Sequence, residues 1–293
     1  QALIAAIPSN AVPPHRDTDQ VAPLLEIKGL QKVFRSRGGW FKPAREVHAL
    51  NDVSLTLARG ETVGIVGESG SGKSTLGRCV VRLEHPDSGE LLLDGVNLSQ
   101  LKGDALRRER HRVQMIFQDP YESMNPRRTI FDTIAEPLLV QGIGNSLDRL
   151  DRVTKLLELV GLTPPATMLF RYPHELSGGQ QQRVQLARSL VLETDILLLD
   201  EPLAALDAKL HKSMCIELKR LQEKVGITFI HVTHNQEEAM TVADDMAIIA
   251  SGELVEGGKA IDLYENPVRR FTADFIGENN IFDGPVTKID GDE

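Results

Sequence analysis

The chain of 293 residues contains only two cysteines, Cys79 and Cys215. They lie far apart and outside any CxxC spacing, so the sequence offers neither a disulfide framework nor a zinc site. Basic residues are outnumbered, since 33 Lys and Arg stand against 42 Asp and Glu, for a formal net charge of -9. A chain without an overall positive field is a poor candidate for binding nucleic acid through the phosphate backbone.

Long apolar runs are also missing. No stretch approaches the roughly 18 residues needed to cross a bilayer as a helix. The apolar start, residues 2–7, is short and runs into Pro8, which is not the pattern of a targeting segment. We therefore expect a chain that reaches a membrane only through a partner.

The hydrophobic content of 41% is enough for one large core with an attached lobe. Residues 1–23 are rich in proline and polar types and predict a flexible leader. From Leu24 onward, short β-rich runs alternate with turns, and the strand pattern then gives way to helical spacing between about residues 119 and 179. After this inserted helical part, strand and helix alternate, which predicts an α/β core with a mainly parallel sheet.

Periodicity and turn residues predict the individual elements. Gly, Pro and charge in Ser36 to Arg45 predict an exposed hairpin or loop insertion. The expected strands are residues 24–27, 53–57, 62–66, 90–93, 113–117, 195–199 and 228–232. The expected helices are residues 76–83, 130–140, 147–160, 184–192 and 209–224.

A phosphate-binding loop follows the strand at residues 62–66. Its sequence fits G-x-x-x-x-G-K-[ST] between a strand and a helix, which is the context that the motif requires. Glycines let backbone N–H groups approach phosphates, and the helix N-terminus favours an anion. Lys73 would contact the β and γ phosphates, and Ser74 would offer a hydroxyl to Mg²⁺. The predicted nucleotide-binding residues here are Gly67, Ser69, Gly70, Ser71, Gly72, Lys73, Ser74 and Thr75.

Two carboxylates, Asp200 and Glu201, end an apolar strand. The carboxyl end of a parallel strand is where α/β sheets place ligands, so Asp200 is a candidate for the metal shell. Glu201 is a candidate base that polarises a water for attack on the γ phosphate. Together the two acids predict hydrolysis of the nucleotide in addition to its binding.

Between these motifs lies the sequence LSGGQQQR, from Leu176 to Arg183. It resembles the signature of the ATP-binding subunits of ABC transporters, and the resemblance extends from about Leu24 to Gly277. This implies a P-loop NTPase (RecA-like) core with a mainly parallel sheet, an antiparallel β subdomain and an inserted helical subdomain. The resemblance also implies that the signature binds the γ phosphate held by a second subunit. The residues carried over for this role are Ser177, Gly178, Gly179 and Gln180.

Other positions match the same family. Gln118 corresponds to the glutamine that touches Mg²⁺ or water, and His234 to the switch histidine that contacts the γ phosphate. Asp207 matches the D-loop, although Ala204 stands where the family often has serine. The resemblance thus implies Glu201, His234, Gln118 and Lys73 as catalytic residues and Ser74, Gln118 and Asp200 around the metal.

The family stacks adenine on an aromatic residue before the first β-hairpin. Phe34 is the candidate in this chain, while the nearby Trp40 and Phe41 compete with it. Core packing is the alternative role for a single aromatic here. The preference for ATP over GTP is an implication of the resemblance, because stacking tolerates different bases.

Two parts of the sequence resemble the ATPases of different transporter types. Trp40 to Pro126 looks like the ATPases of peptide and nickel importers, whereas His231 to Ile281 looks like those of polyamine, sugar and iron importers. The resemblance implies an ATPase domain at residues 24–278. Residues 279–293 would begin a C-terminal β-rich accessory domain that is truncated or absent.

The predicted function is an ATP-hydrolysing subunit, with ATP and Mg²⁺, that powers solute import from the cytoplasmic face of the inner or plasma membrane. Its implied partners are a second ATPase subunit, transmembrane permease subunits and, indirectly, a substrate-binding protein. A permease would dock near Gln118 to Arg128. Two alternatives stay open: a soluble ABC-type ATPase, and a regulatory nucleotide-binding module that does not hydrolyse ATP.

Overall fold

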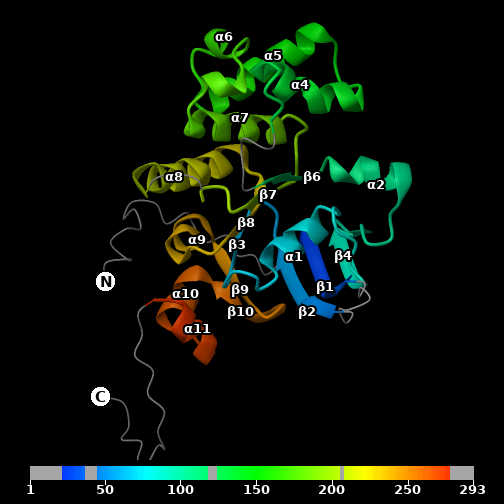
Figure 1. Cartoon of the computed structure of the whole chain (residues 1–293), viewed down its shortest axis with the longest axis vertical. Coiled ribbons are helices and arrows are strands. Elements are labelled where there is room, and N and C mark those ends of the chain that lie inside the picture. Colours follow the sequence, from blue (N-terminus) through cyan, green and yellow to red (C-terminus); the bar gives the residue numbers. More distant parts are fainter. Residues whose placement is uncertain (1–21, 37–44, 118–123, 205–207, 278–293) are drawn as a thin grey trace, which may run out of the picture.

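The computed structural model describes residues 22–36, 45–117, 124–204 and 208–277. The molecule is elongated, with a lobe of helices at one end and a sheet-rich body at the other (Figure 1). The chain passes from the body into the helical lobe and returns, so the lobe is an insertion between strands of one sheet.

A six-stranded sheet with the order β10-β9-β3-β8-β7-β6 forms the centre of the body. Neighbouring strands from β9 to β6 run parallel, and β10 pairs antiparallel with β9. Every residue of β3, β7 and β8 is buried, as expected for strands covered on both faces. The strands are β3 (Thr62–Val66), β6 (Val113–Ile116), β7 (Ile196–Asp200), β8 (Thr228–Thr233), β9 (Asp245–Ala250) and β10 (Glu253–Lys259).

Alternate residues of β7 enter different hydrophobic clusters. Leu197 and Leu199 join the cluster that includes α7 (Gly178–Leu190) and α8 (Ala208–Val225). Ile196 and Leu198 join the cluster that includes α1 (Lys73–Val80) on the other side. Successive side chains of a strand point to opposite faces, so the apolar residues before Asp200 pack against the helices on both faces of the sheet. This packing fixes Asp200 at the carboxyl end of the strand.

A second sheet, antiparallel and four-stranded, has the order β2-β1-β4-β5. Its buried residues share a cluster with α1 and with the central sheet, so it is fixed beside the phosphate loop. The strands are β1 (Leu25–Ser36), β2 (Arg45–Leu57), β4 (Ser88–Leu93) and β5 (Val96–Asn97).

The helical lobe follows β6. Side-chain capping boxes start α4 and α5, with Thr129 paired to Asp132 and Asn145 paired to Asp148, which satisfies otherwise unpaired backbone N–H groups. The buried residues of the lobe belong to the same cluster as those of α8. Its elements are α4 (Ile130–Gln141), α5 (Ser146–Leu159), α6 (Pro165–Met168), a 3₁₀ turn at Pro173–Glu175, and α7. The short α2 (Gly103–Arg110), which precedes β6, buries none of its residues.

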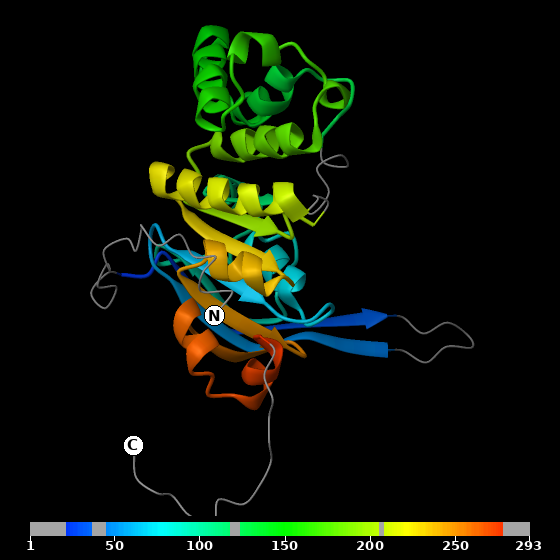
Figure 2. The same cartoon turned by 90° about the vertical axis from the view of Figure 1, so that its left-hand side faces the viewer.

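Three helices close the body near its C-terminal end, where α10 and α11 lie beside β9 and β10 (Figure 2). They are α9 (Gln236–Val242), α10 (Ala260–Glu265) and α11 (Arg270–Phe275). Within the described ranges, no helix combines the length and the apolar character needed to cross a bilayer.

The predicted α/β architecture is confirmed, and several element limits shift. The helix predicted from residue 184 starts at Gly178, because Ser177 and Gln180 form a capping box that starts it earlier. The helix predicted from residue 76 starts at Lys73. The predicted loop insertion, leader and accessory-domain start lie wholly or mainly outside the described residues, although Ser36 pairs with Arg45 across the hairpin.

Candidate active site

The phosphate loop joins β3 to α1, and contacts from distant backbone shape it. A Cβ on Gly67 would lie 2.0 Å from the carbonyl oxygen of Ile249, and one on Gly72 would lie 2.3 Å from that of Ala49. Both glycines also have positive φ, 154° and 110°. Only glycine fits such positions, so the motif glycines let two neighbouring segments pack directly against the loop.

Lys73 is 4% exposed, and its ammonium group donates hydrogen bonds to the carbonyl oxygens of Gly67 (2.8 Å) and Glu68 (2.7 Å). Burial lowers the pKa of Lys73, while Glu201 and Asp200 act in the opposite direction. The hydroxyl of Ser71 is buried, and no group in the described part of the chain bonds to it. A buried cation beside an unpaired hydroxyl and backbone N–H groups fits a phosphate group.

Ser74 and Asp200 meet between the first turn of α1 and the end of β7. The Ser74 hydroxyl donates to Asp200 Oδ1 at 3.0 Å. Asp200 is 6% exposed, and burial raises its pKa, against the hydrogen bond from Ser74. Among the described residues, no group of three His, Cys, Asp or Glu could hold a metal by itself. One carboxylate with one hydroxyl fits Mg²⁺, which keeps waters and phosphate oxygens as its other ligands.

Glu201 follows Asp200 and has a left-handed backbone, with φ 47°. Its N–H donates to the carbonyl oxygen of Val232 at 2.8 Å, which ties it to β8. Its side-chain Oε1 lies 3.3 Å from His234 Nδ1. The His234 side chain is 59% exposed and that of Glu201 20%, so a candidate base and a candidate phosphate contact face the same open edge.

The signature residues lie at the N-terminus of α7. Ser177 Oγ accepts a hydrogen bond from the Gln180 N–H at 3.4 Å, and Gln180 Oε1 accepts one from the Ser177 N–H at 3.0 Å. Ser177 is exposed, and Gly178 and Gly179 are partly exposed. Among the described residues, no hydrogen bond or ion pair joins this helix end to the phosphate loop, so the two motifs lie on separate surfaces of the chain.

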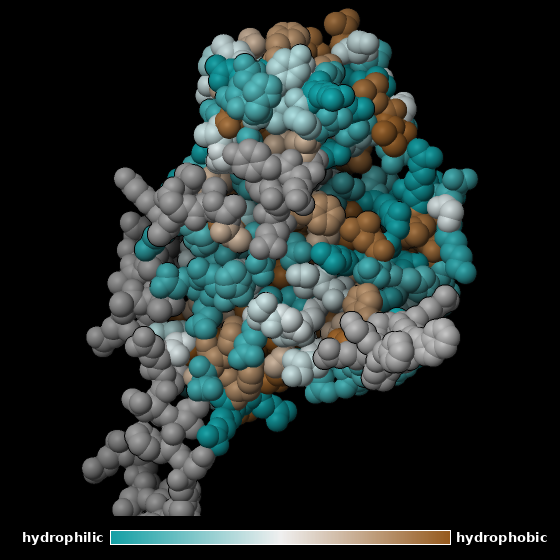
Figure 3. Space-filling model, viewed as in Figure 1, coloured by the Kyte–Doolittle hydropathy of each residue, from teal (hydrophilic) through white to brown (hydrophobic). Residues whose placement is uncertain are grey.

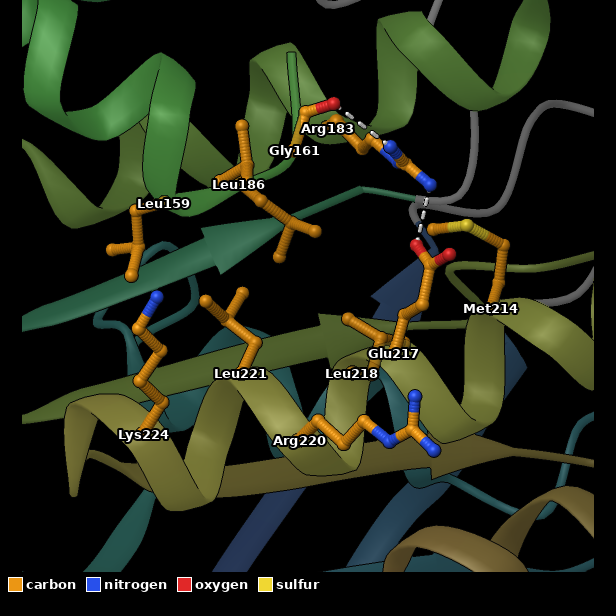
Figure 4. A pocket seen from close by; sticks show the side chains of 11 residues that line it. Leu159, Gly161, Arg183, Leu186, Met214, Glu217, Leu218, Arg220, Leu221 and Lys224 are labelled. Atoms are coloured by element: carbon orange, nitrogen blue, oxygen red, sulfur yellow. Dashed lines mark hydrogen bonds and ion pairs between the residues drawn. The ribbon is translucent and has the colours of Figure 1, made fainter. Parts of the chain in front are cut away.

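A cleft of about 240 Å³ separates the lobe from the core beside the signature helix (Figure 4). Arg183 of α7 crosses it and contacts Glu217 of α8 at 2.6 Å and the carbonyl oxygen of Gly161 at 3.2 Å. Leucines from both sides, including Leu186 and Leu221, line the same cleft. Arg183 therefore ties the signature helix to α8 by an ion pair across a partly open apolar gap, and buried residues of α7 and α8 share one hydrophobic cluster.

Phe34 lies on β1, opposite Val47 of β2, and is 40% exposed. The Lys32 ammonium group lies 5.2 Å from the centre of its ring. An exposed aromatic fits a stacking role better than the alternative of core packing. The competing residues Trp40 and Phe41, together with Gln118 and Asp207, lie outside the described residues.

The sequence alone did not point to Glu238, a buried carboxylate of α9 that bonds to β8, the strand that ends directly before His234. The available indication was a histidine, His231, between the apolar residues of a strand. Its partner stands seven residues further on, which no local motif indicates.

The ABC transporter family model matches residues 50–204 of this chain. A protein of Brucella ovis, named as a peptide import ATP-binding protein, is 42% identical over 250 residues, covering 85% of this chain and 76% of that protein. The chain belongs to the ABC transporter family. The oligopeptide transport ATP-binding protein AppF of Bacillus subtilis is 38% identical to this ABC protein over 251 residues, with the same coverage of 85% and 76%.

Solved structures agree with this assignment. A dimeric bacterial ABC transporter cassette has a TM-score of 0.69 and 30% identity, covering 80% of this chain and 98% of that one. The same cassette in a post-hydrolysis state bound to ADP and Pi gives the same values. A cassette from Clostridium perfringens, part of an ABC transporter complex, has a TM-score of 0.71 and 25% identity, with coverage of 84% and 92%. The predictions of the fold, the family and an ATP-hydrolysing enzyme are confirmed for this ABC protein.

Proposed function

We propose that this ABC protein powers the import of a peptide-like solute. In the proposal it binds ATP with Mg²⁺, pairs with a second ATPase subunit and drives a membrane permease from the cytoplasmic face. The observation that carries the catalytic part is the meeting of Glu201 and His234, 3.3 Å apart, beside the buried Asp200. The relatives named for peptide import and oligopeptide transport support the solute class.

In the proposed mechanism, Lys73 and the N-terminus of α1 hold the β and γ phosphates. Ser74 and Asp200 would hold Mg²⁺, which neutralises charge on the phosphates when it is bound. Glu201 accepts a proton from the attacking water, and His234 holds a γ-phosphate oxygen. Gln118 and Asp207 complete the proposed set.

The signature residues of each chain would complete the site of the other chain. A polar, exposed helix N-terminus is suited to an incoming anion, and Ser177, Gly178 and Gly179 occupy such an end. The dimeric solved relative supports pairing of this kind. Closure of two such sites on ATP would supply the motion that drives the permease.

The proposed permease surface is the part of the lobe near residues 124–128. Phe170 is 74% exposed and Tyr172 39% exposed. The Ile130 N–H donates a hydrogen bond to the carbonyl oxygen of Arg171 at 2.9 Å, which places these two aromatic residues beside the start of α4. Apolar residues are also exposed on the lobe, interspersed with hydrophilic ones (Figure 3). Exposed aromatic side chains of this kind mark protein contacts.

The decisive experiment compares wild type with Glu201→Gln in steady-state hydrolysis, with sedimentation in ATP and Mg²⁺. Loss of the base should lower kcat by about 100-fold or more, while the variant still binds ATP and dimerises. Normal hydrolysis by the variant would disprove the assignment of Glu201. Release of no phosphate by wild type would instead favour a regulatory nucleotide-binding module.

The solute class needs a test in cells. We expect cells that carry only the Glu201→Gln form to lose uptake of a labelled oligopeptide and to keep uptake of labelled spermidine. The reverse result would assign the transporter to polyamines. Loss of neither uptake would contradict the import of both classes by this subunit.

A further inference from the structure

Behind the strand end that carries His234 lies a buried cluster built around one carboxylate. Glu238, on α9, is 4% exposed. Its Oε1 contacts Nε2 of His231 at 2.5 Å, and its Oε2 accepts the Thr233 hydroxyl hydrogen at 2.7 Å. His231 and Thr233 belong to β8 and are 0% and 1% exposed. The carboxylate therefore joins α9 to the last residues of the central strand.

The same cluster clamps the loop on both sides of His234. Thr233 Oγ1 donates to Glu238 and also accepts the N–H of Asn235 at 3.0 Å. Asn235 Oδ1 in turn accepts the N–H of Glu238 at 3.2 Å and caps α9. His234 is the residue between Thr233 and Asn235, so its two neighbours are fixed while its own ring stays exposed toward Glu201.

Only one assignment of donors and acceptors fits these hydrogen bonds when Glu238 is ionised. An ionised carboxylate can only accept, so His231 must donate from Nε2 and Thr233 must donate from Oγ1. His231 Nδ1 is buried, and the described residues offer it no partner, so the ring bonds to Glu238 through Nε2. A buried network with a single pattern of donors and acceptors specifies one conformation of the groups it joins.

The electrostatics agree with an ionised Glu238. Burial by itself raises the pKa of Glu238, but the hydrogen bonds and charges of its neighbours outweigh burial and leave the pKa below its ordinary value of 4.5. The groups that face it are His231 and Thr233 from β8, and His211 from α8, whose Nε2 lies 3.4 Å from Oε2. Cys215 of α8 lies behind His211, with Sγ 3.9 Å from its Nδ1. The contact with His211 also connects the cluster to the first turn of α8, directly after Asp207.

We propose that Glu238 is a positioning residue for ATP hydrolysis, which acts through Thr233 and Asn235 to fix the loop that presents His234 to the γ phosphate. The inference rests on the proposed role of His234. It gives Glu238 no contact with the nucleotide, so it should affect turnover while the binding of ATP stays the same. Small displacements of a catalytic group lower rates strongly, even when the substrate still binds.

The sharpest test uses Thr233, because valine keeps its shape and removes only the hydroxyl. Thr233→Val should lower kcat about 10-fold with the KM for ATP unchanged. Thr233→Ser keeps the hydroxyl and should stay close to the wild-type kcat. Thermal melting of both variants serves as the folding control. Equal losses in both variants, or a KM that rises as kcat falls, would show a merely structural role and overturn the proposal.

A second pair of variants tests whether Glu238 acts through Thr233. Glu238→Gln keeps the size but loses one acceptor, and it should lower kcat without changing the KM. The double variant with Thr233→Val should be no slower than the slower single variant, because both remove the same clamp. Fully additive losses would contradict a shared network.

The result for His234→Ala separates this inference from the proposed function. Full activity of His234→Ala would remove the proposed role of His234 and the positioning role with it. An inactive His234→Ala beside a Thr233→Val variant with wild-type kcat would leave the proposed function standing and refute the positioning role alone.

Discussion

The phosphate loop and the signature segment both lead into a helix N-terminus, yet the chain builds them differently. Backbone of Ala49 and Ile249 presses against the loop glycines, and Lys73 is buried inside it. The signature is held by the reciprocal bonds of Ser177 and Gln180, three residues apart and exposed. A loop with a buried lysine and an exposed tip can hold a ligand within one chain, whereas an exposed helix end is available to a second molecule. In the proposed pairing, each chain would contribute its phosphate loop to one site and its signature segment to the other.

The largest effect is expected when the phosphate loop is disabled in one subunit and the signature segment in another. Lys73→Ala and Ser177→Arg should each be inactive as pure proteins, since both sites of each dimer then lack one half. A mixture should recover part of the hydrolysis, because mixed dimers contain one intact site. Phosphate release measures this outcome.

The control for that mixture combines Lys73→Ala with a subunit carrying both substitutions. None of its dimers contains an intact composite site, so it should remain inactive. Absence of recovery in the first mixture, while both variants are folded and still pair, would place the signature contacts within one chain.

The next largest effect concerns the affinity of a single subunit for ATP, which should depend on the phosphate loop and not on the signature segment. Lys73→Ala removes a buried charged donor, so we expect the Kd for ATP to rise about 100-fold. Ser177→Arg should leave the Kd within about 2-fold of wild type, since its contacts are local and distant from the loop. Calorimetry at concentrations that keep the protein monomeric checks both values. Similar losses in both variants would contradict the separation.

Phe34 should have a smaller effect on the same equilibrium. Phe34→Ala removes a stacking surface for the base and should weaken ATP binding about 10-fold, while Phe34→Trp should bind at least as well as wild type. The same titration with ribose triphosphate, which has no base, should show no difference between the variants. A loss of affinity that persists without the base would point to a packing role for Phe34.

The smallest expected effect concerns the stability of the signature helix. Ser177→Ala removes the side-chain cap and should cost about 1 kcal/mol, a fall in Tm of about 2–4 °C. Ser177→Asp keeps an acceptor and should retain most of the Tm. A Tm unchanged in the alanine variant would show that tertiary packing alone holds the start of α7.

The limits of strands and helices were predicted most accurately where local sequence rules and tertiary structure agree. The strand before the phosphate loop has its predicted limits, Thr62–Val66, because all of its residues are buried and it ends at a glycine turn. The start of α7 was placed too late, since two glycines and three glutamines lack apolar periodicity. The capping pair of Ser177 and Gln180 compensates for that weak pattern.

The site could be predicted residue by residue only where a motif carries it. Lys73, Ser74 and Asp200 come together as their motifs predict. Glu238 and His211 could not be found in this way, because their contact depends on how α9 packs against α8 and β8. Side chains that meet through packing leave no fixed spacing in the sequence, and Arg183 with Glu217 is another such pair.

The left-handed backbone of Glu201 limits which substitutions can stabilise the protein at this position. A side chain in the left-handed region costs about 1 kcal/mol or more, and glycine or asparagine would relieve most of that cost. Neither of those residues has a carboxylate to accept a proton from water. Mutation toward greater stability at this position would therefore remove the proposed base. A library sorted for thermostability alone should lose Glu201 early, and one sorted for transport should retain it.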